Sequence, residues 1–197
     1  ADPPVHWGPK RNVRWRTEVP GNGWSSPVVA GERVFFTTAV PRGEGAAAAD
    51  QSLRAVCLDA ATGAVVWDVE VFLQEGKDAP RIHSKNSHAS PTAVVDGGRV
   101  YVHFGHAGTA CLNAADGRTV WSTRELRYEP VHGNGGSPVL VAGKLVFSID
   151  GTDRQQVVAL DAATGRVAWN TPRDAKPARP FSFGTPLVVP VKGRDQV

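Results

Sequence analysis

The stretch Ala159-Leu-Asp-Ala-Ala-Thr-Gly-Arg-Val-Ala-Trp169 decides the fold, because the same pattern occurs twice more upstream. The earlier copies are Cys57-Leu-Asp-Ala-Ala-Thr-Gly-Ala-Val-Val-Trp67 and Cys111-Leu-Asn-Ala-Ala-Asp-Gly-Arg-Thr-Val-Trp121. The closing tryptophans lie 54 and 48 residues apart. A repeat of roughly 50 residues indicates a fold built from one supersecondary unit used several times.

Two further landmarks recur with the same period. Each repeat opens on a hydroxyl residue and a proline, at Ser26-Pro27, Ser90-Pro91, Ser137-Pro138 and Thr185-Pro186. A glycine then leads into an apolar run in Gly31-Glu-Arg-Val-Phe-Phe36, Gly98-Arg-Val-Tyr-Val102 and Gly143-Lys-Leu-Val-Phe147. Each repeat therefore holds four short strands, which we name A to D, with the tryptophan in strand D.

The turn between strands C and D has its own chemistry. An Asx side chain caps the turn and a glycine supplies the positive φ that a tight turn needs. The residues expected in these structural roles are Asp59, Asn113 and Asp161 with Gly63, Gly117 and Gly165, and the tryptophans Trp67, Trp121 and Trp169.

Four antiparallel strands repeated at this spacing predict the blades of a β-propeller. We expect one all-β domain over residues 1–197 that is a partial propeller, with three complete four-stranded blades, an N-terminal strand and the start of a fourth blade. The expected ranges are about 25–72, 89–126 and 136–172 for the blades, 13–19 for the N-terminal strand and 183–197 for the partial blade. Such an arc cannot close a ring by itself. The expected partners are therefore the remaining blades of a parent protein or a second copy of the chain.

The eleven-residue pattern resembles the tryptophan-docking motif of pyrroloquinoline-quinone (PQQ) propellers, Ala-x-Asp-x-x-Thr-Gly-x-x-x-Trp. The third copy matches every fixed position, the first departs only at Cys57, and the second departs at Cys111, Asn113 and Asp116. The resemblance implies that each indole packs between neighbouring blades. It also extends to PQQ-like propeller proteins of outer-membrane assembly and implies a secreted or periplasmic location.

If the chain were part of a PQQ-dependent dehydrogenase, the resemblance would further imply three features: an adjacent cysteine pair that stacks on the quinone, a bound Ca²⁺ and a catalytic aspartate. The two cysteines of this sequence are far apart, and both stand at the small first position of the motif. We expect them to be small buried hydrophobic residues. No cofactor is predicted, and PQQ with Ca²⁺ is kept as the alternative.

Composition excludes other classes. A net charge of +3 with no run of basic residues does not favour nucleic-acid binding. No apolar stretch approaches the length of a membrane span. The sequence has no methionine, so it is expected to be a mature form or a piece of a longer product.

The segments that join strand D of one blade to strand A of the next, the D–A loops, are expected to gather around the propeller axis on one face. The B–C connections lie on the same face. The candidate ligand-binding residues there are Asn22, Trp24, His83, Lys85, Asn86, His88, His106, His132, Asn134 and Phe183. The same loops could instead only satisfy backbone groups at a crowded axis. The histidine spacing is not diagnostic of a metal site, and no catalytic residue is assigned.

Two functions remain open. The first is a binding or scaffold module, non-catalytic on its own, that takes a protein or small-molecule ligand at the axial face. The alternative is the N-terminal half of a PQQ- and Ca²⁺-dependent quinoprotein dehydrogenase.

Overall fold

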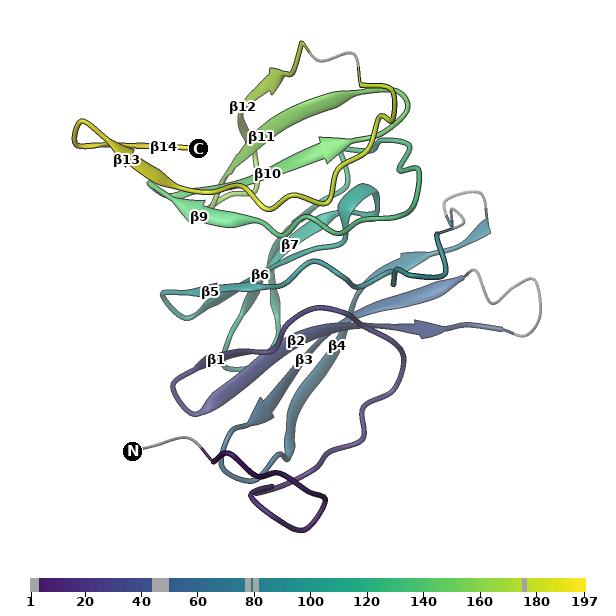
Figure 1. Ribbon diagram of the computed structural model, residues 1–197, viewed down its shortest axis with the longest axis vertical. Helices are drawn as coiled ribbons and strands as arrows, with labels where there is room; N and C mark the ends of the chain where they lie inside the picture. The colour runs from purple at the N-terminus through teal and green to yellow at the C-terminus, as the bar shows by residue number, and fades with distance from the viewer. Residues whose placement is uncertain (1–3, 44–49, 77–78, 80–81, 175–176) are drawn as a thin grey trace.

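The computed structural model describes residues 4–43, 50–76, 79, 82–174 and 177–197. It holds three four-stranded antiparallel sheets and one two-stranded sheet, which lie side by side in chain order (Figure 1). The all-β propeller prediction is confirmed. The sheets stand in the radial arrangement of propeller blades. Within the described residues, no helix is long and apolar enough to cross a membrane.

The strands follow the predicted order A to D in each blade. Blade 1 consists of β1 (Val28–Ala30), β2 (Arg33–Pro41), β3 (Gln51–Asp59) and β4 (Val65–Gln74). Blade 2 consists of β5 (Val94–Asp96), β6 (Arg99–His103), β7 (Thr109–Asn113) and β8 (Thr119–Thr123), with the 3₁₀ turn η3 (Gly105–Ala107) between β6 and β7. Blade 3 consists of β9 (Val139–Val141), β10 (Lys144–Asp150), β11 (Gln155–Asp161) and β12 (Val167–Pro172).

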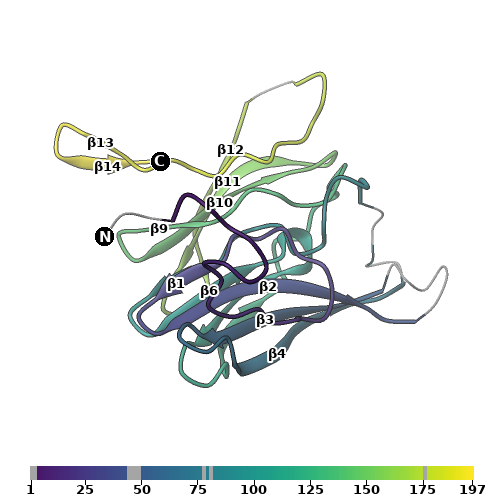
Figure 2. The same cartoon turned by 60° about the horizontal axis from the view of Figure 1, so that its bottom comes forward.

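The two ends of the chain differ from the sequence-based expectation in detail. Residues 13–19 form no ladder with another strand among the described residues, although they hold Trp15 at a tryptophan position. After blade 3, β13 (Val189–Val191) and β14 (Arg194–Gln196) pair as a hairpin, so both strands A and B of the fourth blade are present. Figure 2 shows this hairpin projecting away from the three full blades.

Register explains why the first residue of the motif is small. Cys57 lies opposite Trp67 in the β3–β4 ladder, Cys111 opposite Trp121 in β7–β8, and Ala159 opposite Trp169 in β11–β12. The register shifts immediately after each of these pairs, as a β-bulge does. Both cysteines are fully buried, and burial raises the pKa of the Cys57 thiol to about 11.

The C–D turns show the predicted capping. Asp59 Oδ1 accepts hydrogen bonds from the Ala61 and Thr62 amides at 3.0 and 2.9 Å and from the Thr62 hydroxyl at 2.9 Å. These bonds, the Thr62 hydroxyl first, hold the pKa of Asp59 below its usual value. Gly63 completes the turn with a φ of 73°.

Three indoles dock on the C–D turn of the blade that follows them in the chain. Trp67 Nε1 donates to the Ala114 carbonyl at 3.0 Å and Trp121 Nε1 to the Ala162 carbonyl at 3.0 Å. Trp15 makes the same bond to the Ala60 carbonyl at 2.9 Å. The expectation that Trp169 is buried in the same way is wrong, because its side chain is 37% exposed. Residues 177–197 offer it no C–D turn to dock on.

Near the axis, hydroxyl groups link the blades in series. The Ser26 amide donates to Thr92 Oγ1 at 3.0 Å, the Thr92 amide to Ser137 Oγ at 2.9 Å, and the Ser137 amide to Thr185 Oγ1 at 3.0 Å. In blade 2 the linking residue is Thr92, and not Ser90 of the recurring Ser-Pro pair. These bonds hold neighbouring blades, and so their D–A loops, at a fixed spacing.

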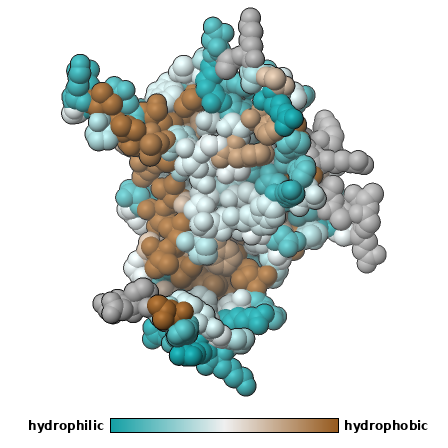
Figure 3. Space-filling model, viewed as in Figure 1, coloured by the Kyte–Doolittle hydropathy of each residue, from teal (hydrophilic) through white to brown (hydrophobic). Residues whose placement is uncertain are grey.

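The hydrophobic core lies between the blades. One cluster packs blade 1 against blade 2 around Phe35, Leu53 and Phe104, and another packs blade 2 against blade 3 around Cys111 and Phe147. Figure 3 shows a further band of apolar residues on the surface turned to the viewer, and this band runs from the β13 end of the molecule toward β1.

Candidate ligand-binding site

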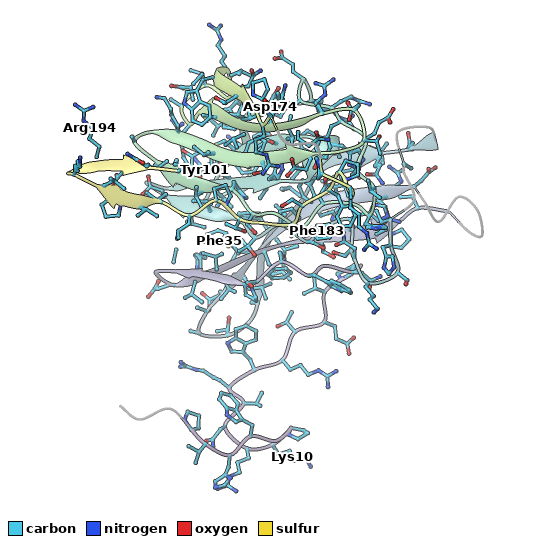
Figure 4. The ribbon with its side chains drawn as sticks, turned by 45° about the horizontal axis from the view of Figure 1, so that its top comes forward. Lys10, Phe35, Tyr101, Asp174, Phe183 and Arg194 are labelled. Atoms are coloured by element: carbon cyan, nitrogen blue, oxygen red, sulfur yellow. The ribbon has the colours of Figure 1, made fainter. Side chains whose placement is uncertain are left out.

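The D–A loops converge on a cavity of about 470 Å³. Its walls come from the loops that lead into all four blades. The lining residues are Trp24, His83, Lys85, Asn86, Ser90, His132, Gly135 and Phe183. Phe183 lies on the segment between β12 and β13, well away from the hairpin tip near which Arg194 is labelled (Figure 4).

Asn86 ties two of these loops together. Its Nδ2 donates to the carbonyls of His132 and Asn134, at 2.9 and 3.1 Å. Its Oδ1 accepts from the Ser87 amide at 2.9 Å and from the Ser90 hydroxyl at 2.6 Å. Both ends of the side chain are therefore engaged within the protein, and Asn86 shapes the wall of the cavity.

Asn134 and His106 lie beneath the loops. Asn134 is buried, its Oδ1 accepts from the Tyr128 hydroxyl, and its Nδ2 donates to the Phe104 carbonyl at 3.1 Å. The same Nδ2 lies 3.2 Å from His106 Nδ1. Burial raises the pKa of Tyr128, so its hydroxyl stays protonated and can donate. Neither Asn134 nor His106 lines the cavity, and Asn134 instead supports the loop that carries His132.

Aromatic and imidazole rings form a row along one wall. The His83 and His132 ring centroids are 5.2 Å apart at 81°, and His132 meets Phe181 edge-on at 4.7 Å. Phe181 in turn lies 5.6 Å from Phe183. The Lys85 amide donates to His83 Nδ1 at 3.0 Å, so the neutral ring carries its proton on Nε2 and can donate from there.

A second cavity of about 310 Å³ adjoins the first. Trp24 and Asn86 line both. The other residues that line the second cavity are Asn22, Ala39, Pro41, Gln51, Ile82, Ser84, Ser87 and His88. Gln74 Nε2 donates to His88 Nδ1 at 3.0 Å, and burial lowers the pKa of His88, so this imidazole is neutral with its proton on Nε2.

The structure thus distributes the ten sequence-based candidates over three places. Six line the first cavity, Asn22 and His88 line the second, and Asn134 and His106 lie beneath. Sequence reasoning missed Ser90 and Gly135, which stand inside the same loops. It also missed Phe181, whose contact with His132 depends on how two blades meet.

The described residues do not fit the cofactor apparatus of a quinoprotein dehydrogenase. The cysteines are buried in different blades, and no group of three or more His, Cys, Asp or Glu side chains in the described ranges could hold a metal ion.

Known proteins share this architecture. The chain is 26% identical over 189 residues to a polyvinylalcohol dehydrogenase of a Pseudomonas species, a match over 88% of this chain and 26% of that protein. Among solved structures, a europium-containing methanol dehydrogenase superposes with a TM-score of 0.57 at 17% identity, over 82% of this chain and 26% of that one. The quinohemoprotein alcohol dehydrogenase ADHIIG from Pseudomonas putida HK5 superposes with a TM-score of 0.54 at 22% identity, over 79% of this chain and 21% of that one. The chain spans about a quarter of the length of these proteins.

The model of a protein family also matches the chain. That family is described as outer membrane protein assembly factor BamB, and the match covers residues 10–71 and 49–197. With the repeats, the blade topology and this match over most of its length, the chain belongs to the family of PQQ-like repeat propellers.

Proposed function

We propose that this chain is a secreted or periplasmic PQQ-like propeller module that binds a ligand at its axial mouth and is not catalytic on its own. The observation that carries the proposal is the 470 Å³ cavity built from the D–A loops of successive blades. Concave sites with aromatic walls and a few polar groups are where propellers and other folds bind ligands. The hydrogen bonds of Asn86 and Asn134 hold these walls in place without a ligand.

The residues that line the cavity are suited to binding a ligand more than to catalysing a reaction. The polar atoms of Asn86 and Ser90 are hydrogen-bonded to each other and to nearby backbone and side-chain groups. His83, His132 and Lys85 offer hydrogen-bond donors next to the aromatic surfaces of Trp24 and Phe183. Such a set orients a ligand.

We expect small polar ring compounds to bind the purified chain in a ligand-detected NMR screen, with Trp24→Ala abolishing most of the binding. Trp24 borders both cavities, and its indole is 58% exposed, against 44% for the Phe183 ring. Trp7→Ala is the matched control, because Trp7 is 69% exposed and lines neither cavity. Equal loss of binding in both variants, or no binding compound at all, would contradict the proposal.

The alternative is that the chain is part of a quinoprotein dehydrogenase. What favours it is the similarity to dehydrogenases several times longer than this chain. On the first proposal, the chain supplied with PQQ and Ca²⁺ oxidises neither alcohols nor sugars with an artificial electron acceptor, because the described residues do not fit a Ca²⁺ site. PQQ-dependent turnover would establish the alternative instead.

We further propose that an additional blade, from a parent protein or from a second copy, packs against the face of blade 3 that carries Trp169, as blades 2 and 3 pack against Trp67 and Trp121. Every residue of β12 is exposed, including Trp169. Soluble proteins rarely leave large apolar surfaces open. By light scattering we expect the isolated chain to exceed 20.9 kDa. A monodisperse monomer with one cooperative thermal transition would show that this face needs no cover.

A further inference from the structure

The two adjoining cavities differ in the chemistry of their walls, and this difference indicates which kind of ligand could fill both. Of the eight described residues that line the larger cavity, Lys85 is the one Lys, Arg, Asp or Glu, and it stands among aromatic and imidazole rings. The smaller cavity has no Asp, Glu, Lys or Arg among its described lining residues, and its polar groups are amides, hydroxyls and a neutral imidazole. A ligand that fills both needs one negative group at one end and neutral polar groups at the other.

Trp24 connects the two halves. Its side chain borders both cavities and is 58% exposed, so a flat, largely unoccupied indole surface extends from one to the other. Its backbone amide donates to the Ala89 carbonyl at 3.1 Å, which fixes this residue against the loop that leads into blade 2. An aromatic face of this kind packs against the C–H groups of a ring that also bears polar substituents.

The donors around this surface are set in advance. His83 and His88 each accept a hydrogen bond at Nδ1, from the Lys85 amide and from Gln74 Nε2, so each neutral ring is a donor at Nε2. Hydroxyl-rich ligands are matched by such donors together with the amide side chain of Asn22, which lines the smaller cavity. The ammonium group of Lys85 is matched by a carboxylate.

We infer that the paired cavities bind an acidic saccharide of two rings, with the carboxylate of a uronate sugar at Lys85 and a second sugar in the smaller cavity. The inference rests on the proposed function, because it names the ligand class of the same axial mouth. The cavities, of about 470 and 310 Å³, are each large enough for one sugar ring, and Trp24 borders both.

Isothermal titration calorimetry on the full 197-residue chain tests this with three probes: the α-1,4-linked disaccharide galacturonosyl-galactose, which carries a single carboxylate, the neutral disaccharide α-1,4-galactobiose, and 2-naphthoate. We expect galacturonosyl-galactose to bind about tenfold more tightly than galactobiose, as one charge-assisted hydrogen bond allows. Lys85→Gln should remove that difference. Lys10→Gln should preserve it, because Lys10 is an exposed lysine that lines neither cavity. Trp24→Ala should weaken both disaccharides at least about tenfold, and Trp7→Ala should not.

Two outcomes overturn the inference and leave the proposed function standing. Tighter binding of naphthoate than of galacturonosyl-galactose, with the same dependence on Trp24, would make the ligand an aromatic acid. Equal binding of the two disaccharides would remove the role of Lys85. Thermal melting of each variant separates loss of binding from loss of fold, and failure of every compound in the NMR screen would reject the binding site itself.

Discussion

Replacing Trp67 by alanine is expected to lower the free energy of unfolding by about 3–5 kcal/mol, as for large aromatic residues in cores. The side chain is 7% exposed, and its ring lies 5.9 Å from that of Phe35 in the same blade. Its Nε1 donates to the Ala114 carbonyl of blade 2, and its ring packs on Gly117 of the same turn. The truncation therefore removes packing within one blade and the contact between two. Urea unfolding followed by circular dichroism measures the effect.

Trp169→Ala is the internal control for this experiment. Trp169 lies opposite Ala159 in blade 3, as Trp67 lies opposite Cys57 in blade 1, but it is 37% exposed. We expect it to cost less than about 1 kcal/mol, as surface substitutions do. Equal costs for the two variants would mean that docking on the next blade contributes little to stability.

Gly165→Ala is expected to cost about 2–5 kcal/mol for two separate reasons. Gly165 has a φ of +73°, where a residue with a Cβ is strained by about 1–2 kcal/mol. An added Cβ would also stand 2.6 Å from Trp121 Cδ2, so the docked indole would have to move, and overpacking of this kind costs about 1–3 kcal/mol. Chemical denaturation with near-ultraviolet circular dichroism reports both the stability and the displacement of Trp121.

Gly143→Ala separates the two contributions. Gly143 has a φ of +69°, close to that of Gly165, but an added Cβ there meets no heavy atom within 4 Å. The difference between the two variants is therefore the cost of pushing the indole away from its turn. Indistinguishable losses of stability would show that the Trp121 contact tolerates a methyl group, against the close packing described above.

The sequence by itself determined the blades, since their signals are local. The Leu-Asp-Ala-Ala-Thr-Gly turn carries its own cap and its own positive-φ glycine, so its structure follows from adjacent residues, as the three bonds to Asp59 Oδ1 confirm. The same locality predicted strands A to D and the spacing at which they repeat. It also placed His106 in a B–C connection and the other candidate residues in D–A loops, because a loop is defined by the strands that flank it.

Only the tertiary structure decided what those residues contact. Asn134 and His132 are two positions apart in one loop, yet one is buried against the Phe104 carbonyl and the other lines the cavity. Trp67 and Trp169 share one motif but differ in burial. In each case the deciding neighbour belongs to another blade, tens of residues away in the chain. Such contacts depend on how whole sheets pack together, so they cannot be predicted from a local sequence pattern.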